Sequence, residues 1–388
     1  MKLTLIVKAT ESCNASCLYC SVADKATKKA RMDDAVVRLL FDRIGEFLEE
    51  RPGAEVEIIW HGGEPLLMGA GFYRAVYDTQ CAVLGNEARR VHHAFQTNLT
   101  LFNESFAEVF HLLGVRSIGS SYESHEGLRR LGGGDSSGSY DRLFLRGLRA
   151  LERMGIPVGL IHVVTSLTIA RPVESVLFAA NLLADRTKGG VRFNRIYREG
   201  EARKGELASL AVTGEQFGHF LGAVFSYWLE HREMLPDIEP CTTIYKELVE
   251  KRACGGCEDS GSCGTTHLGI DPEGNIHQCG RSMDAGVLRF GTLRDTRLAA
   301  VFDHPAKRLL NERSARLAET ACRSCRFFSW CHGGCPVDGY RGGGDVMERG
   351  DVCDAKRVFL GDYVEPLLGV TFRHGDRRSG VDADRDPS

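Results

Sequence analysis

Apolar and polar positions alternate regularly over the first 235 residues. Short apolar runs predict buried β-strands at residues 3–10, 55–60, 91–97, 116–121, 158–165 and 191–197. The segments between and after them have the three-to-four-residue apolar spacing of amphipathic helices, at residues 34–50, 71–84, 103–113, 140–154, 173–184 and 213–234. This order of elements predicts an α/β fold with a parallel sheet and right-handed helical crossovers.

Six β/α units are fewer than the eight that close a barrel, so we expect a partial (β/α)6, TIM-like barrel that is open on one side. Functional residues of such barrels collect at the C-terminal ends of the strands. The polar residues that directly follow each predicted strand are therefore the first candidates for a site.

Composition and charge narrow the class of protein. The chain has 388 residues, of which 43% are hydrophobic and 26% charged, as in ordinary globular proteins. Its net charge of −3 gives no basic footprint for nucleic acid. Since neither a membrane-spanning apolar run nor a signal peptide is evident, we expect a cytoplasmic protein with no nucleic-acid or membrane partner.

Fourteen cysteines are unevenly distributed along the chain. Three follow the first predicted strand, Cys81 is isolated, and ten lie between Cys241 and Cys353. Cytoplasmic chains rarely form disulfides, so this abundance points to metal binding or catalysis.

The first group, Cys13, Cys17 and Cys20, has the spacing C-x3-C-x2-C. Thiolates select iron–sulfur clusters, zinc or Cu(I), and a structural zinc site is the plainer alternative. A four-iron cluster normally takes four thiolates. Three would leave one iron open to a small molecule.

Polar segments also follow the next three predicted strands. They are His61-Gly62-Gly63-Glu64-Pro65, then Gln96-Thr97-Asn98, then Ser120-Ser121-Tyr122-Glu123. Glycines let the backbone approach a ligand, and a carboxylate such as that of Glu64 can hold an ammonium group. A GGEP segment alone is often only a turn, so its position after a strand and a cysteine loop is what gives it weight.

Together these motifs resemble the radical S-adenosylmethionine (SAM) superfamily. The resemblance implies that Cys13, Cys17 and Cys20 hold a [4Fe–4S] cluster whose open iron binds SAM. It implies cofactor-binding roles for Tyr19, Gly62, Gly63, Glu64, Pro65, Asn98, Ser121 and Arg130. The spacing at Arg130 is off by about one residue, and a solvated basic face shared with Arg129 is its alternative.

The C-terminal cysteines carry the most specific pattern in the chain. From Cys263 it reads C-x10-G-x4-C, a gap, C-x2-C-x5-C-x3-C, a gap and a final C. This resembles the SPASM extension of radical SAM enzymes, which binds two auxiliary clusters. The resemblance implies one ligand set of Cys257, Cys263, Cys279 and Cys335 and a second of Cys322, Cys325, Cys331 and Cys353. Cys254 competes with Cys257 as a ligand.

We therefore expect a radical SAM barrel over residues 1–235, a small Cys-rich SPASM domain over 236–360, and a tail over 361–388 whose last part is disordered. Within the SPASM domain, residues 267–277 predict a β-hairpin. By resemblance the cofactors are SAM and three [4Fe–4S] clusters.

The resemblance implies an oxidoreductase that forms a 5′-deoxyadenosyl radical and abstracts a hydrogen from a peptide substrate. We rank a peptide maturase that forms thioether or C–C cross-links first. An anaerobic sulfatase-maturing enzyme, which converts Ser or Cys to formylglycine, is the alternative, and a small-molecule dehydrogenase is the third. Sulfatase-maturing enzymes carry an aspartate base directly after the third extension ligand and read QGGEP, whereas this chain has Gly280 and His61.

The catalytic base is not identified by any motif, and Glu123, His162 and Tyr197 are the candidates. The expected partners are a peptide or protein substrate, a reductant such as flavodoxin or ferredoxin, and a separate leader-peptide-binding protein, since no peptide-binding domain precedes the barrel. A multi-cluster electron carrier and a zinc-stapled binding module are the non-enzyme alternatives. Neither needs a barrel with GGEP after its second strand.

Overall fold

The structure is a computed structural model that describes residues 1–22, 29–125, 127–132, 137–183, 189–196, 205–252 and 256–374. Six strands and six helices alternate in its first part. The strands are β1 (Lys2–Thr10), β2 (Glu55–Gly62), β3 (Val91–Gln96), β4 (Ile118–Ser121), β5 (Val158–Val164) and β6 (Val191–Arg195). The helices are α1 (Asp34–Glu50), α2 (Ala70–Leu84), α3 (Glu104–Leu112), α4 (Ser137–Arg153), α5 (Pro172–Leu183) and α6 (Gly214–His231). All twelve match the predicted elements, with ends that differ by three residues at most.

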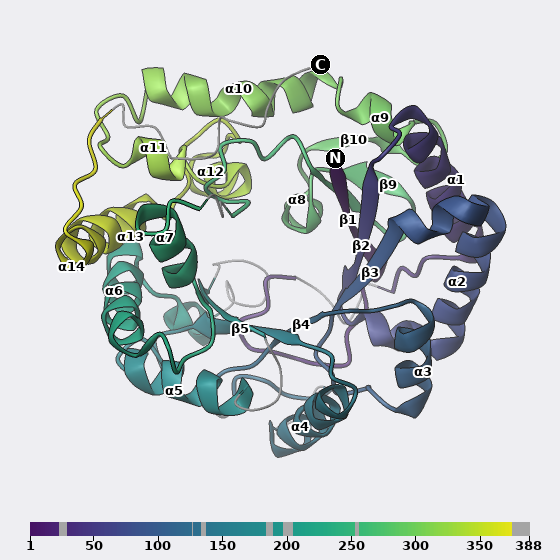
Figure 1. The fold of residues 1–388 in the computed structure, drawn as a ribbon, viewed down its shortest axis with the longest axis horizontal. Helices are drawn as coiled ribbons and strands as arrows, with labels where there is room; N and C mark the ends of the chain where they lie inside the picture. The colour runs from purple at the N-terminus through teal and green to yellow at the C-terminus, as the bar shows by residue number, and fades with distance from the viewer. Residues whose placement is uncertain are drawn as a thin grey trace.

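These strands form one parallel, curved sheet in the order β1-β2-β3-β4-β5-β6. Figure 1 shows the six helices around the outside of the arc, which confirms the predicted α/β partial barrel. The C-terminal helices lie across the side that the arc leaves open. None of the helices within the described ranges combines the length and the apolar character that crossing a membrane requires.

Local sequence explains where the helices begin and which face they bury. Asp33 caps α1 by accepting a hydrogen bond of 2.8 Å from the backbone N–H of Val36. Thr213 and Gln216 form a reciprocal capping box at the start of α6. The buried side of α1 consists of Val36, Val37, Leu40, Phe41, Ile44, Phe47 and Leu48, which is the apolar face that its spacing predicts.

The later part of the chain adds four strands to the same sheet. They are β7 (Ile238–Glu239), β8 (His267–Ile270), β9 (Asn275–His277) and β10 (Arg289–Thr292), and the full order is β10-β9-β8-β1-β2-β3-β4-β5-β6-β7. Strands β8 and β9 form the predicted hairpin. The sequence did not predict that β8 pairs in parallel with β1, from Thr4 with His267 to Val7 with Ile270. The sheet therefore has ten strands, because β8 pairs with the free edge of β1 and β7 pairs with β6 at the other end.

Short helices complete the C-terminal part. They are α7 (Cys241–Leu248), α8 (Gly280–Ala285), α9 (Leu298–Val301), α10 (Pro305–Glu319), α11 (Phe328–Cys331), α12 (Pro336–Gly343), α13 (Cys353–Val358), a π-helical turn at Phe359–Val364 and α14 (Glu365–Leu368). Helix α10 begins at Pro305, whose fixed φ suits the first turn of a helix. Helix α13 packs against α6, which joins this part to the outside of the barrel.

Candidate active site

A cavity of about 310 Å³ opens at the C-terminal ends of the central strands. Its lining includes all three thiols of the first cysteine group and most of the predicted cofactor positions: Cys13, Cys17, Cys20, Tyr19, Gly62, Gly63, Asn98 and Ser121. Glu64, Pro65 and Arg130 are described but do not line it. The fold thus brings together motifs that are as far apart in the sequence as Cys13 and Ser121.

Gly62 and Gly63 hold the GGEP segment against the start of the cysteine loop. The backbone N–H of Gly63 donates to the Thr10 carbonyl over 3.0 Å, and that of Glu64 donates to the Ser12 carbonyl over 2.9 Å. A Cβ on Gly62 would lie 2.0 Å from the Thr10 oxygen, and one on Gly63 would lie 2.2 Å from the Ser12 oxygen. The glycines are therefore required for two backbone segments to touch.

Glu64 lies beneath the cavity, with 1% of its surface exposed. Its carboxylate accepts hydrogen bonds from the Thr97 hydroxyl (2.6 Å), the Asn98 N–H (2.7 Å) and the Leu66 N–H (2.9 Å). Burial raises the pKa of Glu64 to about 7, against the lowering effect of these bonds. In this structure Glu64 ties the loop after β2 to the loop after β3, and the predicted contact of its carboxylate with the SAM ammonium stays a prediction.

Asn98 and Ser121 face the cavity from the ends of β3 and β4. The Asn98 amide donates to the Asn14 side chain over 2.9 Å and lies 4.0 Å from the Cys13 sulfur. Ser120 points the other way, because its hydroxyl donates to the Thr97 carbonyl and is fully buried. Of the two adjacent serines, Ser121 is thus the one that lines the site.

A buried polar cluster fixes the other side of the cysteine loop. The Tyr19 hydroxyl donates to Glu123 over 2.5 Å, and Arg129 holds both carboxylate oxygens of Glu123, over 2.6 and 3.0 Å. Arg129 also donates to the Tyr140 hydroxyl over 3.0 Å and lies 3.9 Å from the Cys17 sulfur. Burial raises the pKa of the Tyr19 hydroxyl well above its usual value. Glu123 is therefore engaged in holding the loop.

Replacing Arg129 by methionine should destabilise the protein strongly. The Glu123 side chain is 1% exposed and would be left as a buried charge without its counter-ion. Breaking such a pair costs about 3–5 kcal/mol of the free energy of unfolding. The measurement is the denaturant midpoint of the anaerobic holoprotein. Arg130→Met, which removes a donor to the Gly127 carbonyl, is the matched control, and equal small effects would contradict the assigned role of Arg129.

Of the other two candidate bases, the structure describes only His162, which does not line this cavity. His162 is fully buried on β5 and alternates with Ile161 and Val163, which line the cavity, so its ring faces the opposite side. There it lies 5.1 Å from the Phe193 ring, and burial lowers its pKa to about 4. Tyr197 and Cys254 lie outside the described residues.

Three charged side chains that sequence reasoning missed also line the cavity: Arg129, Arg195 and Asp284. Arg195 ends β6 and forms an ion pair with Asp351. Asp284 pairs with Lys8, which is 4% exposed on β1. A lysine within the apolar run at residues 3–10 was the available signal, because a buried ammonium needs a counter-charge.

The first C-terminal thiol group consists of Cys257, Cys263, Cys279 and Cys335. The pKa of the Cys263 thiol is raised well above its usual value, first by its hydrogen bond with Cys257, then by burial and by Cys279 and Cys335. Arg281 lies beside this group, 3.4 Å from the Cys335 sulfur, and is held by Asp338. Cys335 therefore lies near enough to Cys263, which precedes it by more than fifty residues, to act on that thiol.

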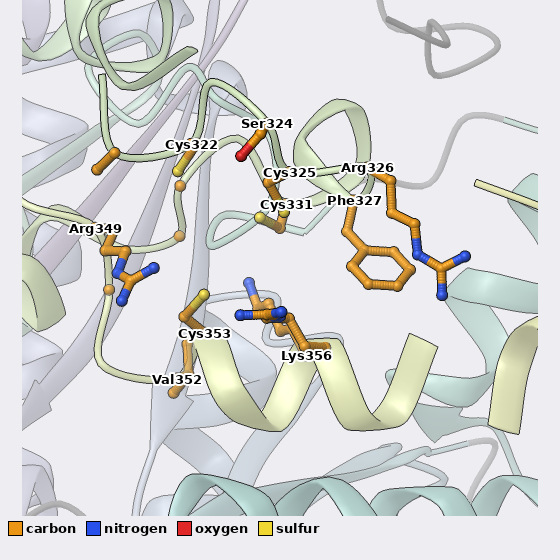
Figure 2. A pocket seen from close by; sticks show the side chains of 15 residues that line it. Cys322, Ser324, Cys325, Arg326, Phe327, Cys331, Arg349, Val352, Cys353 and Lys356 are labelled. Carbon is orange, nitrogen blue, oxygen red and sulfur yellow. The ribbon is translucent and has the colours of Figure 1, made fainter. Parts of the chain in front are cut away.

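The second group surrounds a cavity of about 320 Å³ between α11 and α13. Figure 2 shows the sulfurs of Cys322, Cys325, Cys331 and Cys353 directed toward this space, with Arg349 and Lys356 at its sides. Burial raises the pKa of the Cys322 thiol to about 11, and the Cys331, Cys325 and Cys353 thiols add to the shift.

The second thiol group has the arrangement expected of cluster ligands. Within the described ranges, no three His, Cys, Asp or Glu side chains converge closely enough to hold one metal ion. A zinc ion would need four ligands at about 2.3 Å. The thiols of Cys322, Cys325, Cys331 and Cys353 instead surround a cavity, as ligands of a four-iron cube would.

Residues 7–179 match the family described as the radical SAM superfamily. This part of the chain therefore resembles a radical SAM domain, which is typical of SAM-dependent radical enzymes. Its Cys-rich C-terminal part agrees with a SPASM-type extension.

Proteins with similar sequences have names that state a more specific function. The chain is 27% identical over 366 residues to the serine-type anaerobic sulfatase-maturating enzyme of Klebsiella aerogenes, covering 92% of this chain and 84% of that one. It is 24% identical over 380 residues to the cysteine-type enzyme of Clostridium perfringens, covering 94% and 97%.

Two solved structures share the fold. The structure of anSMEcpe with bound AdoMet and Kp18Cys peptide has a TM-score of 0.77 at 20% identity, covering 95% of this chain and 98% of that one. Streptococcus suis SuiB bound to the precursor peptide SuiA has a TM-score of 0.59 at 17% identity, covering 91% and 76%.

Proposed function

We propose that this chain is a peptide-modifying radical SAM enzyme of the sulfatase-maturating type. It would oxidise a serine or cysteine side chain of a peptide or protein substrate to formylglycine. The observation that carries this proposal is the extent of the similarity, because relatives named as serine-type and cysteine-type sulfatase-maturating enzymes align with 92% and 94% of the chain. The sequence alone ranked cross-linking first, and the relatives favour the alternative.

Several residues that line the cavity have side chains or backbone suited to this reaction. Cys13, Cys17 and Cys20 would hold a [4Fe–4S] cluster, and Gly62 and Gly63 would bring the backbone close to SAM. When bound, the cluster and SAM supply a 5′-deoxyadenosyl radical. The two C-terminal thiol groups would each hold a further [4Fe–4S] cluster with no open iron, which suits electron relay. The proposed total is three clusters.

The proposal includes partners. A reductant such as flavodoxin or ferredoxin would supply the electron that starts the reaction. The substrate is a peptide or protein segment, and a separate leader-peptide-binding protein would be needed if the substrate carries a leader. The cytoplasm is the proposed location, since free thiols in these numbers suit a reducing compartment.

Cross-linking of a ribosomally made peptide remains the second candidate, and Gly280 is the observation that favours it. By resemblance, the sulfatase-maturing enzymes carry an aspartate at the position that directly follows Cys279 in this chain. This chain offers no side chain there, and a Cβ at Gly280 would meet the Ile6 side chain at 3.4 Å.

The test is anaerobic reconstitution of the full chain with iron and sulfide. We expect about twelve irons per chain, four per cluster. With dithionite, SAM and a peptide that contains a serine or cysteine in a sulfatase-type sequence, we expect 5′-deoxyadenosine and a peptide aldehyde that reacts with a hydrazide. A cross-linked peptide without an aldehyde would favour the second candidate. Colourless protein with stoichiometric zinc would overturn both.

A further inference from the structure

Helix α8 places a carboxylate inside the barrel. Figure 1 shows this helix within the arc of strands, beside β1. The start of α8 at Gly280 packs over Ile6, and Asp284, one helical turn later, reaches Lys8 further along the same face of β1. Sulfatase-maturing enzymes are expected to carry an aspartate at the position of Gly280. In this chain an aspartate, Asp284, comes one helical turn later and faces the same strand, β1.

Asp284 and Lys8 form a largely buried ion pair. The Lys8 Nζ lies 2.5 Å from Asp284 Oδ1, and the two side chains are 5% and 16% exposed. The second oxygen, Oδ2, has no hydrogen bond within the part of the chain that the structure describes. Asp284 thus has one oxygen held in place and a second that remains available.

This carboxylate belongs to the same cavity as the first thiol group. Cys13, Cys17 and Cys20 line that cavity together with Asp284, and among the described lining residues Asp284 is the only Asp or Glu. A substrate side chain that enters the cavity to meet the radical therefore meets one carboxylate.

The neighbouring polar groups are less suited to accept a proton. His61 Nδ1 is engaged by the backbone of Gly62, whose N–H lies 2.7 Å away and whose carbonyl oxygen lies 3.3 Å away. Burial, with the Lys8 ammonium, lowers the His61 pKa and disfavours a second proton. Glu123 is held by Tyr19 and Arg129.

We propose that Asp284 accepts the proton that the substrate side chain loses during its oxidation, and that Lys8 is a positioning residue that orients the carboxylate. This inference rests on the proposed function. It also explains how a chain with Gly280 can perform an oxidation that needs a base.

For a serine substrate, the oxidation conserves atoms, electrons and protons. One hydrogen atom leaves Cβ and converts the 5′-deoxyadenosyl radical to 5′-deoxyadenosine. The resulting carbon radical would give one electron to an iron–sulfur cluster, which the C-terminal thiols would hold as the oxidant. The hydroxyl proton moves to Asp284 Oδ2 as the C=O bond forms. A cysteine substrate gives a thioaldehyde by the same steps, and water then replaces its sulfur, releasing hydrogen sulfide.

The experiment uses the reconstituted enzyme and a substrate peptide deuterated at Cβ. In Asp284→Asn we expect deuterium still to enter 5′-deoxyadenosine, while aldehyde formation falls about 100-fold or more, as for loss of a general base. Asp284→Glu should recover most of the activity. Asp42→Asn, on the exposed side of α1, is the control variant and should behave as the unmodified enzyme.

A double variant separates catalysis from folding. Asp284→Asn leaves the Lys8 ammonium buried without its partner, whereas Lys8→Met/Asp284→Asn removes both charges. If Asp284 is the proton acceptor, the double variant recovers the denaturant midpoint and the iron content but not aldehyde formation. Recovery of aldehyde formation in the double variant would show a purely structural pair and would overturn the proposal.

Different results would contradict the proposed function and the proposed role of Asp284. If the unmodified enzyme makes aldehyde and Asp284→Asn makes it within about threefold of that rate, the role of Asp284 is wrong while the proposed function stands. If the unmodified enzyme consumes SAM with peptide yet forms no aldehyde, the proposed function is wrong and this inference is overturned with it.

Discussion

Gly63→Ala is expected to weaken SAM binding strongly and so to lower its reductive cleavage. The added Cβ would lie 2.2 Å from the Ser12 oxygen, 2.5 Å from the Ser12 carbonyl carbon and 2.6 Å from the Glu11 oxygen. These are backbone atoms, so the two loops must separate and lose the hydrogen bonds that join them. Overpacking of about 1–3 kcal/mol, with two lost bonds of about 1 kcal/mol each, predicts a fall in SAM affinity of about 100-fold or more.

The measurement is SAM binding by the reconstituted protein, followed by 5′-deoxyadenosine release after reduction. Gly71→Ala is the matched control, because Gly71 lies on α2 and an added Cβ meets nothing within 4 Å. That variant should be unchanged or slightly more stable, since alanine favours helix. Unimpaired SAM cleavage by Gly63→Ala would contradict the close packing of the two loops.

Cys335→Ala is expected to remove one auxiliary cluster and leave the other two. Cys335 follows Cys331 closely in sequence, yet its thiol lies near enough to Cys263 to raise the pKa of the Cys263 thiol. Iron should therefore fall from about twelve to about eight per chain. SAM cleavage without peptide should persist, because Cys13, Cys17 and Cys20 line a separate cavity. Aldehyde formation should be lost if electrons leave through this cluster.

Cys353→Ala provides the comparison, since it should remove the cluster of the other group. The double variant Cys335→Ala/Cys353→Ala should lose about eight irons if the two thiols belong to different clusters. It should lose only about four if they share one. The second result would show that the assignment of Cys335 is wrong.

The elements of the barrel could be predicted from the sequence because their signals are local. The apolar spacing of α1 and its Asp33 cap lie within a single stretch of chain. The strand–loop positions of Cys13, Gly62 and Asn98 follow from the same pattern, since parallel strands bring their C-terminal ends together.

The remaining features depend on contacts between distant segments. Arg129 and Arg130 are adjacent and chemically identical, and only the fold turns Arg129 toward Glu123. The pairing of Lys8 with Asp284 joins positions that are 276 residues apart. No periodicity within α8 indicates which strand it will cover, so the carboxylate of the cavity was not predicted.

The parallel pairing of β8 with β1 has a consequence for the order of folding. The strand that leads into the cysteine loop is synthesised first, but its neighbour on one side is made only after the whole barrel has left the ribosome. Until then β1 presents an open edge, which is a template for intermolecular pairing. A nascent or truncated chain that ends after α6 should therefore aggregate, whereas a chain that extends past Ile270 can protect this edge.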